Sequence, residues 1–204
     1  MYNPTGSDSW GSGDVFVHDR VTGATTMVSV TPGGTDGNDD SDTPAISADG
    51  RYVAFVSWAS NLVAGDTNWQ SDVFVRDRVT GATTRVSVAS DGTQANGLNR
   101  TPMISADGRY VAFPSEASNL VAGDTNGKPD VFVRDRVTGA TTRVSVTNAG
   151  SQANGNSGRP AINADGRYVA FESDASNLVA GDTNAKMTCS CATGSRRALR
   201  PSPG

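Results

Sequence analysis

Apolar residues along this chain occur in short runs that are separated by glycine-rich polar turns. In the stretch "RYVAFVS", Tyr52, Ala54 and Val56 face one side of an extended strand. Val53 and Phe55 face the other side, and apolar side chains on both faces predict a strand that is covered on both sides. A second stretch, "DVFVRDR", is apolar on both faces in the same way. No segment shows sustained helical periodicity, so the pattern predicts an all-β chain.

Three sequence modules recur along the chain. The spacing between successive copies is 58 residues, as in 72 − 14 or 104 − 46, and the copies are nearly identical. This indicates recent duplication of one unit, which makes the repeat the first guide to the architecture. The modules are "DVFVRDRVTGATTRVSV" with variants from Asp14, Asp72 and Asp130, "ISADGRYVAF" with a variant from Ile46, Ile104 and Ile162, and "ASNLVAGDTN" from Ala59, Ala117 and Ala175.

Each unit is predicted to contain four strands: "TPAIS", "RYVAFVS", "DVFVRDR" and "ATTRVSV". The "ADG" and "VTG" turns between them supply a glycine that can take a positive φ. In the fourth strand Thr84, Val86 and Val88 share one face. Arg85 and Ser87 lie on the opposite face, which predicts a half-polar outer strand.

Four-stranded units in tandem are the sequence form of β-propeller blades. The predicted propeller region is residues 1–186, and the alternative is an open β-repeat array. About three blades result, too few to close a ring of the usual four or more. Two readings stay open: a fragment of a longer array, or a homodimer in which two chains complete a six-bladed ring. The parts are a half blade at 14–30, blades at 42–88 and 100–146, and a half blade at 158–174.

The stretch "SADGRYVAFVS…SDVFVRDRVTG" resembles the TolB-like β-propeller repeat family. The resemblance covers nearly all of residues 14–186, with Ala48 where that repeat usually has proline. It implies a β-propeller fold and suggests a periplasmic or extracellular location. It says little about function, because such blades occur in binding modules and beside peptidase domains. The matching positions are Ser47, Asp49, Gly50, Ala54 and Phe55, followed by Asp72, Val75 and Asp77.

The composition of the chain argues against several classes of function. The chain has 204 residues, a net charge of −4 and a pI near 4.9, so nucleic acid is not expected as a partner. No run approaches the roughly 18 apolar residues that a membrane-spanning helix needs. The N-terminal stretch "MYNPTGSDSWGSG" has no signal-peptide pattern.

Two loops carry a candidate calcium pattern. "DTNWQSD" and "DTNGKPD" place oxygen ligands at positions 1, 3 and 7, as hard-cation loops do. The EF-hand pattern is not met, and Asx turns before a strand explain the same residues. Ca²⁺ is the only cofactor that the sequence suggests. The candidate ligands are Asp66, Asn68, Asp72, Asp124, Asn126 and Asp130.

Catalysis has little support in the sequence. His18 is the single histidine and lies within a predicted strand, whereas every notable acidic residue comes in copies. The repeated "DRVTG" is interpreted either as a charged binding surface or as a solvated hairpin with a weak cross-strand ion pair. We therefore expect no enzyme. The sequence predicts a binding or scaffold module for a protein or carbohydrate. The alternatives are a structural segment of a larger extracytoplasmic protein and a calcium-binding repeat.

The C-terminal stretch departs from the repeat. The period predicts "DVFVRDRVT" from residue 188, but the chain reads "TCSCATGSR". Codons for residues 187–195 can be chosen so that a one-nucleotide shift spells the expected repeat. The hypothesis is a frame slip near Lys186 with a disordered tail at 187–204. Cys189 and Cys191 are accordingly not interpreted as a metal or redox site.

Overall fold

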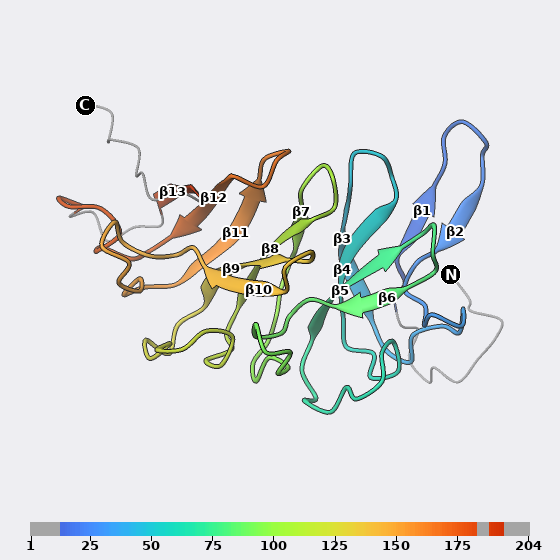
Figure 1. Ribbon diagram of the computed structural model, residues 1–204, viewed down its shortest axis with the longest axis horizontal. Coiled ribbons are helices and arrows are strands. Elements are labelled where there is room, and N and C mark those ends of the chain that lie inside the picture. The colour runs from blue at the N-terminus through green and yellow to red at the C-terminus, as the bar shows by residue number, and fades with distance from the viewer. Residues whose placement is uncertain (1–12, 183–187, 194–204) are drawn as a thin grey trace.

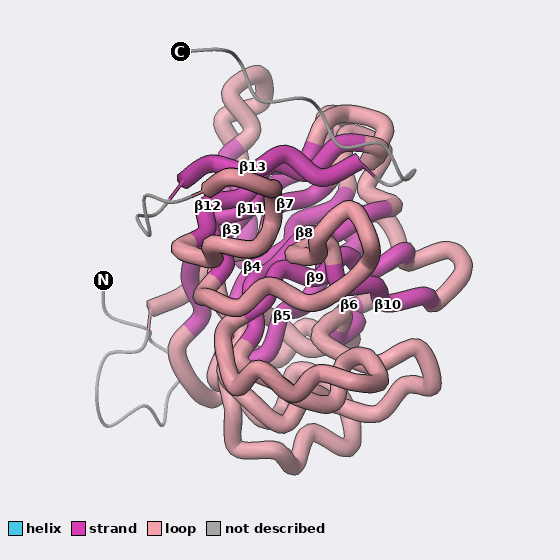
Figure 2. The backbone as a smooth tube through the Cα atoms, turned by 90° about the vertical axis from the view of Figure 1, so that its left-hand side faces the viewer, coloured by secondary structure: helices cyan, strands magenta, loops and turns pink. Residues whose placement is uncertain are grey.

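The computed structural model describes residues 13–182 and 188–193 of the chain. Within these residues it contains strands, turns and loops and no helix (Figure 2). All neighbouring strands pair antiparallel. The strands are β1 (Phe16–His18), β2 (Thr25–Met27), β3 (Ser41–Ile46), β4 (Tyr52–Ser57), β5 (Asp72–Asp77), β6 (Thr83–Arg85), β7 (Met103–Ile104), β8 (Tyr110–Ser115), β9 (Asp130–Asp135), β10 (Ala140–Arg143), β11 (Ser157–Ile162), β12 (Tyr168–Ser173) and β13 (Thr188–Thr193).

The strands form four separate sheets that follow one another along the chain. Sheet 1 is β1–β2, sheet 2 is β3–β6, sheet 3 is β7–β10 and sheet 4 is β11–β13. The sheets stand side by side in a row, with sheet 1 at one end and sheet 4 at the other (Figure 1). Successive four-stranded antiparallel sheets in this arrangement are the blades of an incomplete β-propeller, as the repeat predicts.

Apolar clusters fill the spaces between successive sheets. Ala54 and Val56 on β4 pack with Val111 and Phe113 of sheet 3. The opposite face of β4 packs against sheet 1 in a second cluster, where Phe55 is fully buried. A third cluster joins sheets 3 and 4. Each face of "RYVAFVS" thus packs against a different neighbouring sheet, which confirms the prediction of a strand covered on both sides.

The turns after the first strands also connect the sheets. Ala48 N donates to Ala106 O at 3.0 Å, and Ala106 N donates to Ala164 O at 3.0 Å. Gly108 lies in the middle turn with φ 73°, and a Cβ there would lie 2.1 Å from Cδ2 of the Tyr52 ring. Glycine is therefore required at this position both by the left-handed backbone and by the close approach of the preceding sheet.

The expected extent and the expected exposure of the fourth strand both need correction. The fourth strand, expected over "ATTRVSV", ends at Arg85 in sheet 2. The face predicted to be polar and outward is not exposed, because Ser87 is fully buried and the Arg85 side chain is 11% exposed. Both side chains turn toward β5, where they contact Asp72.

The stretch 188–193 forms β13, although the sequence predicts disorder for 187–204. Its register with β12 runs from Ser173 opposite Thr188 to Tyr168 opposite Thr193. The same register places β5 beside β4 and β9 beside β8. Backbone pairing does not require the repeat's side chains, which is why "TCSCAT" can take this position. The remaining residues of the predicted tail lie outside the described part of the chain.

Candidate functional site

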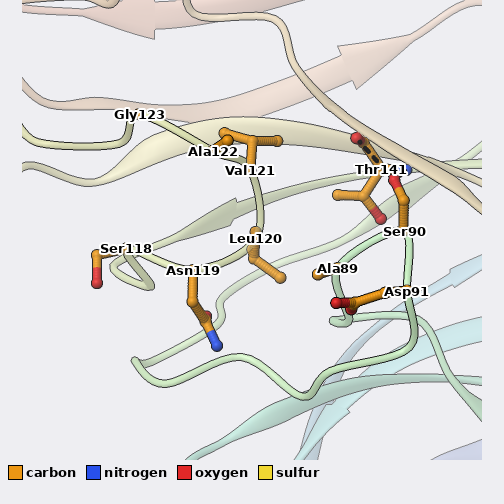
Figure 3. Close-up of a pocket in the computed structure, with 10 residues that line it drawn as sticks. All are labelled: Ala89, Ser90, Asp91, Ser118, Asn119, Leu120, Val121, Ala122, Gly123 and Thr141. Carbon is orange, nitrogen blue, oxygen red and sulfur yellow. Dashed lines mark hydrogen bonds between the residues drawn. The ribbon is translucent and has the colours of Figure 1, made fainter.

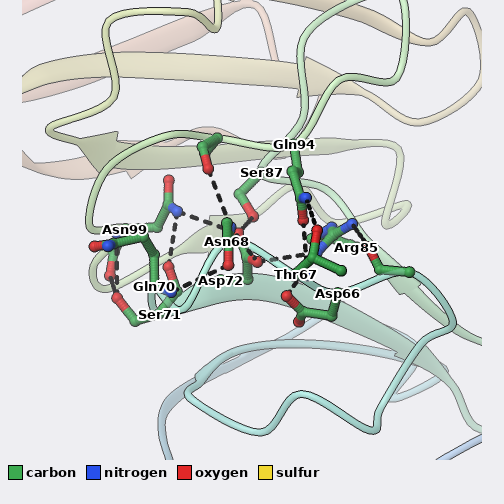
Figure 4. Close-up of polar contacts among 12 residues, drawn as sticks. Asp66, Thr67, Asn68, Gln70, Ser71, Asp72, Arg85, Ser87, Gln94 and Asn99 are labelled. Carbon is green, nitrogen blue, oxygen red and sulfur yellow. Dashed lines mark hydrogen bonds and ion pairs between the residues drawn. The ribbon is translucent and has the colours of Figure 1, made fainter.

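The residues of the first predicted calcium loop come together at the start of β5 (Figure 4). Asp72 is fully buried there. Its Oδ1 accepts from Ser87 Oγ at 2.5 Å and from Asn99 Nδ2 at 3.3 Å. Its Oδ2 accepts from Asn68 Nδ2 at 2.9 Å. The carboxylate therefore joins the long loop, the outer strand and the connection to the next sheet.

Arg85 supplies the positive charge of this network. Its Nη1 lies 3.0 Å from Asp66 Oδ1 and 3.2 Å from Asp72 Oδ2. All three side chains are largely or fully buried, with exposed fractions of 11%, 6% and 0% for Arg85, Asp66 and Asp72. Burial raises the pKa of both carboxyl groups, and the hydrogen bonds and the guanidinium oppose that rise.

The second predicted loop repeats the arrangement in sheet 3. Asn126 Nδ2 donates to Asp130 Oδ2 at 2.9 Å. Arg143 Nη1 lies 3.2 Å from Asp124 Oδ1 and 3.2 Å from Asp130 Oδ2. Ser145 Oγ donates to Asp130 Oδ1 at 2.5 Å, as Ser87 does to Asp72. The "DTN" module therefore builds the same buried ionic network twice.

The structure brings together the candidate calcium ligands of each loop, but a guanidinium stands between the two carboxylates. Among the residues that the structure describes, no group of three or more histidine, cysteine, aspartate or glutamate side chains could hold a metal ion. Ca²⁺ binding at these loops stays an alternative suggested by the sequence, and the position of the guanidinium argues against it. Arg85, Ser87 and Asn99 were not among the candidates from sequence. Arg85 recurs 58 residues later as Arg143, with the same spacing as the loops. This repetition is the signal that could have linked the arginine to the loops.

The aspartate of the "DRVTG" module forms an ion pair across the β4–β5 strand pair. Asp77 is bound by Arg51, with Nε to Oδ1 at 3.0 Å and Nη2 to Oδ2 at 2.8 Å. This two-pronged contact holds the pKa of Asp77 far below its usual range. Arg78 instead donates from Nη1 to Gly50 O at 2.6 Å. Arg109 and Asp135 repeat the Arg51–Asp77 pair in sheet 3.

An open groove of about 600 Å³ lies between the turn after β6 and the loop after β8 (Figure 3). Its polar side chains are already engaged within the protein. Asn119 donates to Gln94 O, Ser118 Oγ accepts from Asn96, and Ser90 Oγ accepts from Thr141 N. A ligand that used these polar groups would therefore have to displace their partners within the protein.

Exposed tryptophans mark one end of sheet 2. Trp58 follows the last residue of β4 and is 45% exposed. Trp69 lies in the long loop shortly before β5, which begins at Asp72, and it is 88% exposed. Since Ser57 pairs with Asp72, both tryptophans lie at the same end of the β4–β5 pair. The repeat has Glu116 and Gly127 at the corresponding positions of sheet 3.

Trp69 has an unusual backbone. Its φ is 56°, in the left-handed region that Gly127 occupies with φ 62°. A non-glycine residue in this region costs about 1–2 kcal/mol. A large aromatic side chain is therefore held exposed at a position where the next repeat uses glycine. Sequence reasoning did not single out Trp69, although comparing "DTNWQSD" with "DTNGKPD" shows the difference.

His18 lies in β1 and faces the neighbouring strand of the hairpin. Its Nδ1 is 2.8 Å from Thr25 Oγ1. The nearby acids have other partners: Asp14 accepts from Ser29, and Asp19 accepts from the backbone of its own turn. The histidine is thus engaged in a hairpin contact.

The described sheets, with their blade-to-blade apolar clusters, define the fold as an incomplete β-propeller. Solved structures agree with this fold. TolB from Acinetobacter baumannii matches with a TM-score of 0.52 and 18% identity over 91% of this chain and 36% of that one. A putative TolB from Agrobacterium tumefaciens matches with a TM-score of 0.53 and 16% identity, covering 81% of this chain and 47% of that one.

A prolyl endopeptidase structure is also similar, with a TM-score of 0.52 and 15% identity over 90% of this chain and 25% of that one. The chain thus spans less than half the length of each of these structures. No protein-family description and no curated protein matches the chain. In the described residues there is no helix of the length and apolarity needed to cross a membrane.

Proposed function

We propose that this chain is a non-catalytic β-propeller segment that binds a protein or carbohydrate partner through Trp69 and Trp58. The observation that carries the proposal is Trp69, which is 88% exposed with φ 56°. Exposed aromatic side chains are rich sources of binding energy, and tryptophan is enriched among interface hot spots. An exposed aromatic side chain contributes little to packing, so a binding role better explains why the strained backbone at Trp69 is retained.

The repeat itself supports a role for Trp69 outside folding. Sheet 3 builds the same Asp–Arg network with Gly127 in place of the tryptophan. The loop therefore does not need the indole ring for its own structure. A non-catalytic role is supported by the repetition of the buried acids and by the hairpin contact of His18.

The test compares the full chain with its Trp69→Gly variant. Gly127 shows that glycine suits this backbone, so we expect the free energy of unfolding to change by no more than about 1 kcal/mol. Binding is measured against two probes: soluble oligosaccharides of glucose and of N-acetylglucosamine, and peptides selected from a random display library on the wild-type chain. We expect the affinity for the bound probe to fall at least about tenfold in the variant.

Val79→Ala serves as the control, because Val79 is also exposed but lies in the turn between β5 and β6. It should bind like the wild type. If no oligosaccharide or peptide distinguishes the wild type from Trp69→Gly, the binding proposal fails. The purely structural segment is then the better description of the chain.

A further inference from the structure

Among the described residues, the two ends of the row of sheets have complementary sets of strands. Sheet 1 consists of the hairpin β1–β2 alone, whereas sheets 2 and 3 each have four strands. Sheet 4 has the first two strands of the repeat, followed by β13. Sheets 1 and 4 stand at opposite ends of the row, so the hairpin of one chain does not reach its own β12 (Figure 1).

The β1–β2 hairpin has the internal structure of the third and fourth strands of a complete sheet. Ser29 Oγ donates to Asp14 Oδ1 at 2.9 Å and accepts from Val15 N at 3.1 Å. In sheet 2, Ser87 makes the same two contacts with Asp72 and with Val73 N. The hairpin is therefore already formed in the shape in which β5–β6 joins β4.

Aromatic packing is the first contact that is complete inside the row and incomplete at its ends. Phe74 packs on Phe55 in sheet 2, with ring centroids 6.0 Å apart. Phe132 and Phe113 repeat this pair at 6.2 Å in sheet 3. Phe16, the copy of Phe74, is 52% exposed. Its counterpart on sheet 4 is Phe171, which lies opposite Ser190 in the register of β12 and β13.

An ion pair is divided between the ends in the same way. Arg51 binds Asp77 in sheet 2, and Arg109 binds Asp135 in sheet 3. The next arginine of the series, Arg167, forms no salt bridge with a described residue, and Thr193 stands opposite Tyr168 where the repeat has aspartate. The first aspartate of the series, Asp19, likewise forms no salt bridge within the described residues.

The third divided contact is an arginine on a tyrosine ring. Arg136 Cζ lies 4.5 Å from the centroid of Tyr52, and Arg136 Nη1 donates to Gly108 O at 2.5 Å. One repeat further on, a pocket of about 370 Å³ is lined by Tyr110, Asp135, Gly166 and Arg167. At the position 58 residues after Arg136 the sequence has Gly194, which lies outside the described residues.

Arg20 is the arginine that matches this pocket. It follows Asp19 in the hairpin as Arg136 follows Asp135, and it is exposed. If the hairpin joined sheet 4 in the register of the repeat, Asp19 would lie at Arg167. Arg20 would then reach the Tyr110 ring and Gly166 O, as Arg136 reaches Tyr52 and Gly108 O. One placement thus completes all three contacts.

We propose that the β1–β2 hairpin of a second copy of this chain pairs with β12, in place of β13, and that two copies joined at both ends form a six-bladed ring. Phe16, Asp19 and Arg20 of one copy then contact Phe171, Arg167 and Tyr110 of the other. The half blades of each copy become complete, so the ring contains two copies of sheets 2 and 3 and two shared blades. This self-assembly is independent of the binding role of Trp69.

The occupant is a second copy because the hairpin carries the repeat's own side chains at every position of contact. Residues 188–193 carry "TCSCAT" where the hairpin has "DVFVHD". The hairpin therefore offers the phenylalanine and the aspartate that β13 does not have. The contact is head to tail, and such contacts close into rings or continue as filaments, depending on the rotation between copies.

The solution mass of the full chain tests the proposal, measured by light scattering after size-exclusion chromatography over a wide concentration range. Two copies of 21.0 kDa are expected, with a dimer that dissociates on dilution. Phe16→Ser should raise the dissociation constant by about thirtyfold or more. Arg20→Ala should raise it by about tenfold.

Arg136→Ala is the matched control for Arg20→Ala, because it removes the equivalent contact with Tyr52 inside one copy and should leave the mass unchanged. Circular dichroism of each variant shows whether it folds. Arg167→Asp should weaken the dimer, and combining it with Asp19→Arg should restore it by reversing the pair. A monomer at every concentration overturns the proposal, and so does a dimer that Phe16→Ser and Arg20→Ala leave intact. Filaments without a discrete dimer overturn the two-copy ring.

Discussion

Sheets 2 and 3 are nearly identical in sequence, yet their loops before the third strand differ at three successive positions, the first of which is Trp69 in sheet 2 and Gly127 in sheet 3. Both sheets bury an aspartate at the start of that strand and share an arginine between two carboxylates. The loop of sheet 2 then exposes Trp69, whereas the loop of sheet 3 has Gly127 with nearly the same backbone. The ionic network that the two sheets share serves the fold, whereas the indole ring of Trp69 is exposed and occurs in only one of them.

The shared network gives the largest expected effect. Asp72→Ala in sheet 2 and Asp130→Ala in sheet 3 should each lower the free energy of unfolding by about 3–5 kcal/mol. Each change leaves a buried guanidinium with one carboxylate fewer and removes the acceptor of a buried serine. Urea denaturation followed by tryptophan fluorescence measures the loss.

Asp91→Ala is the control for these changes, because the Asp91 carboxylate bonds Thr93 N within its own exposed turn. It should change stability by about 0.5 kcal/mol or less. Unequal losses for Asp72→Ala and Asp130→Ala would show that the two networks are not equivalent. A loss below about 1 kcal/mol in both would contradict a structural role.

Substitutions in the "ADG" turns give the next largest effect on stability, and the effect should differ between the two sheets. Gly50 and Gly108 have φ of 71° and 73°, so alanine should cost about 1–2 kcal/mol at either position. A Cβ at Gly108 would also meet the Tyr52 ring at 2.1 Å, whereas the nearest atom at Gly50 is 3.7 Å away. Gly108→Ala should therefore cost about 1–3 kcal/mol more than Gly50→Ala.

Thermal unfolding of both variants measures this difference at one pH and one protein concentration. Equal losses in the two variants would show that the Tyr52 ring moves aside without cost. Tyr52→Ala combined with Gly108→Ala distinguishes the cases, because removing the ring should abolish the additional cost and leave the cost of the left-handed backbone.

The paired aspartates give a smaller effect that depends on pH. Arg51 and Arg109 lower the pKa of Asp77 and Asp135. A carboxyl group with a lowered pKa in the folded state stabilises it above the unfolded pKa of about 3.9. That stabilisation is lost as the pH falls through the folded pKa. Asp77→Asn should therefore cost about 1–2 kcal/mol at neutral pH and progressively less below about pH 4.

Melting temperatures of the wild type and of Asp77→Asn across the acid range measure the convergence, and Asp135→Asn should behave in the same way. Burial raises the pKa of Asp66, Asp72 and Asp124. The contribution of these three groups to the stability of the folded state depends on pH in the opposite way. It is present below the unfolded pKa and is lost as the pH rises through the folded pKa. A constant difference between the wild type and Asp77→Asn at all pH values would contradict the Arg51 contact.

The fold could be predicted from sequence to the level of individual blades. The 58-residue period gives the unit, and the two-sided apolar pattern of "RYVAFVS" gives a strand between two neighbours. The outer strand could not be read correctly, because polar residues in alternation predict solvent contact. Arg85 and Ser87 are instead buried by a long-range pairing with Asp72, which a local pattern does not contain.

The candidate site was predicted only in part. The oxygen-bearing residues of "DTNWQSD" do converge, but the sequence spacing does not show that Arg85 supplies the charge at their centre. Trp69 was missed because an exposed aromatic residue carries no periodic signal. Its significance depends on a φ that only the structure provides, and on the glycine that replaces it in the next repeat.

The smallest expected effect concerns calcium. Arg85 and Arg143 already place a positive charge between the carboxylates that the "DTN" pattern offers to a cation. We therefore expect the melting temperature to be the same with excess Ca²⁺ and with chelator, and we expect no heat of binding by calorimetry. Arg85→Met sharpens the test, because it removes the guanidinium while keeping much of its apolar volume. If this variant alone gains stability from Ca²⁺, the carboxylates are suitable ligands that the arginine occupies. If the wild type gains stability from Ca²⁺, the cation displaces Arg85, and the loops are calcium sites after all.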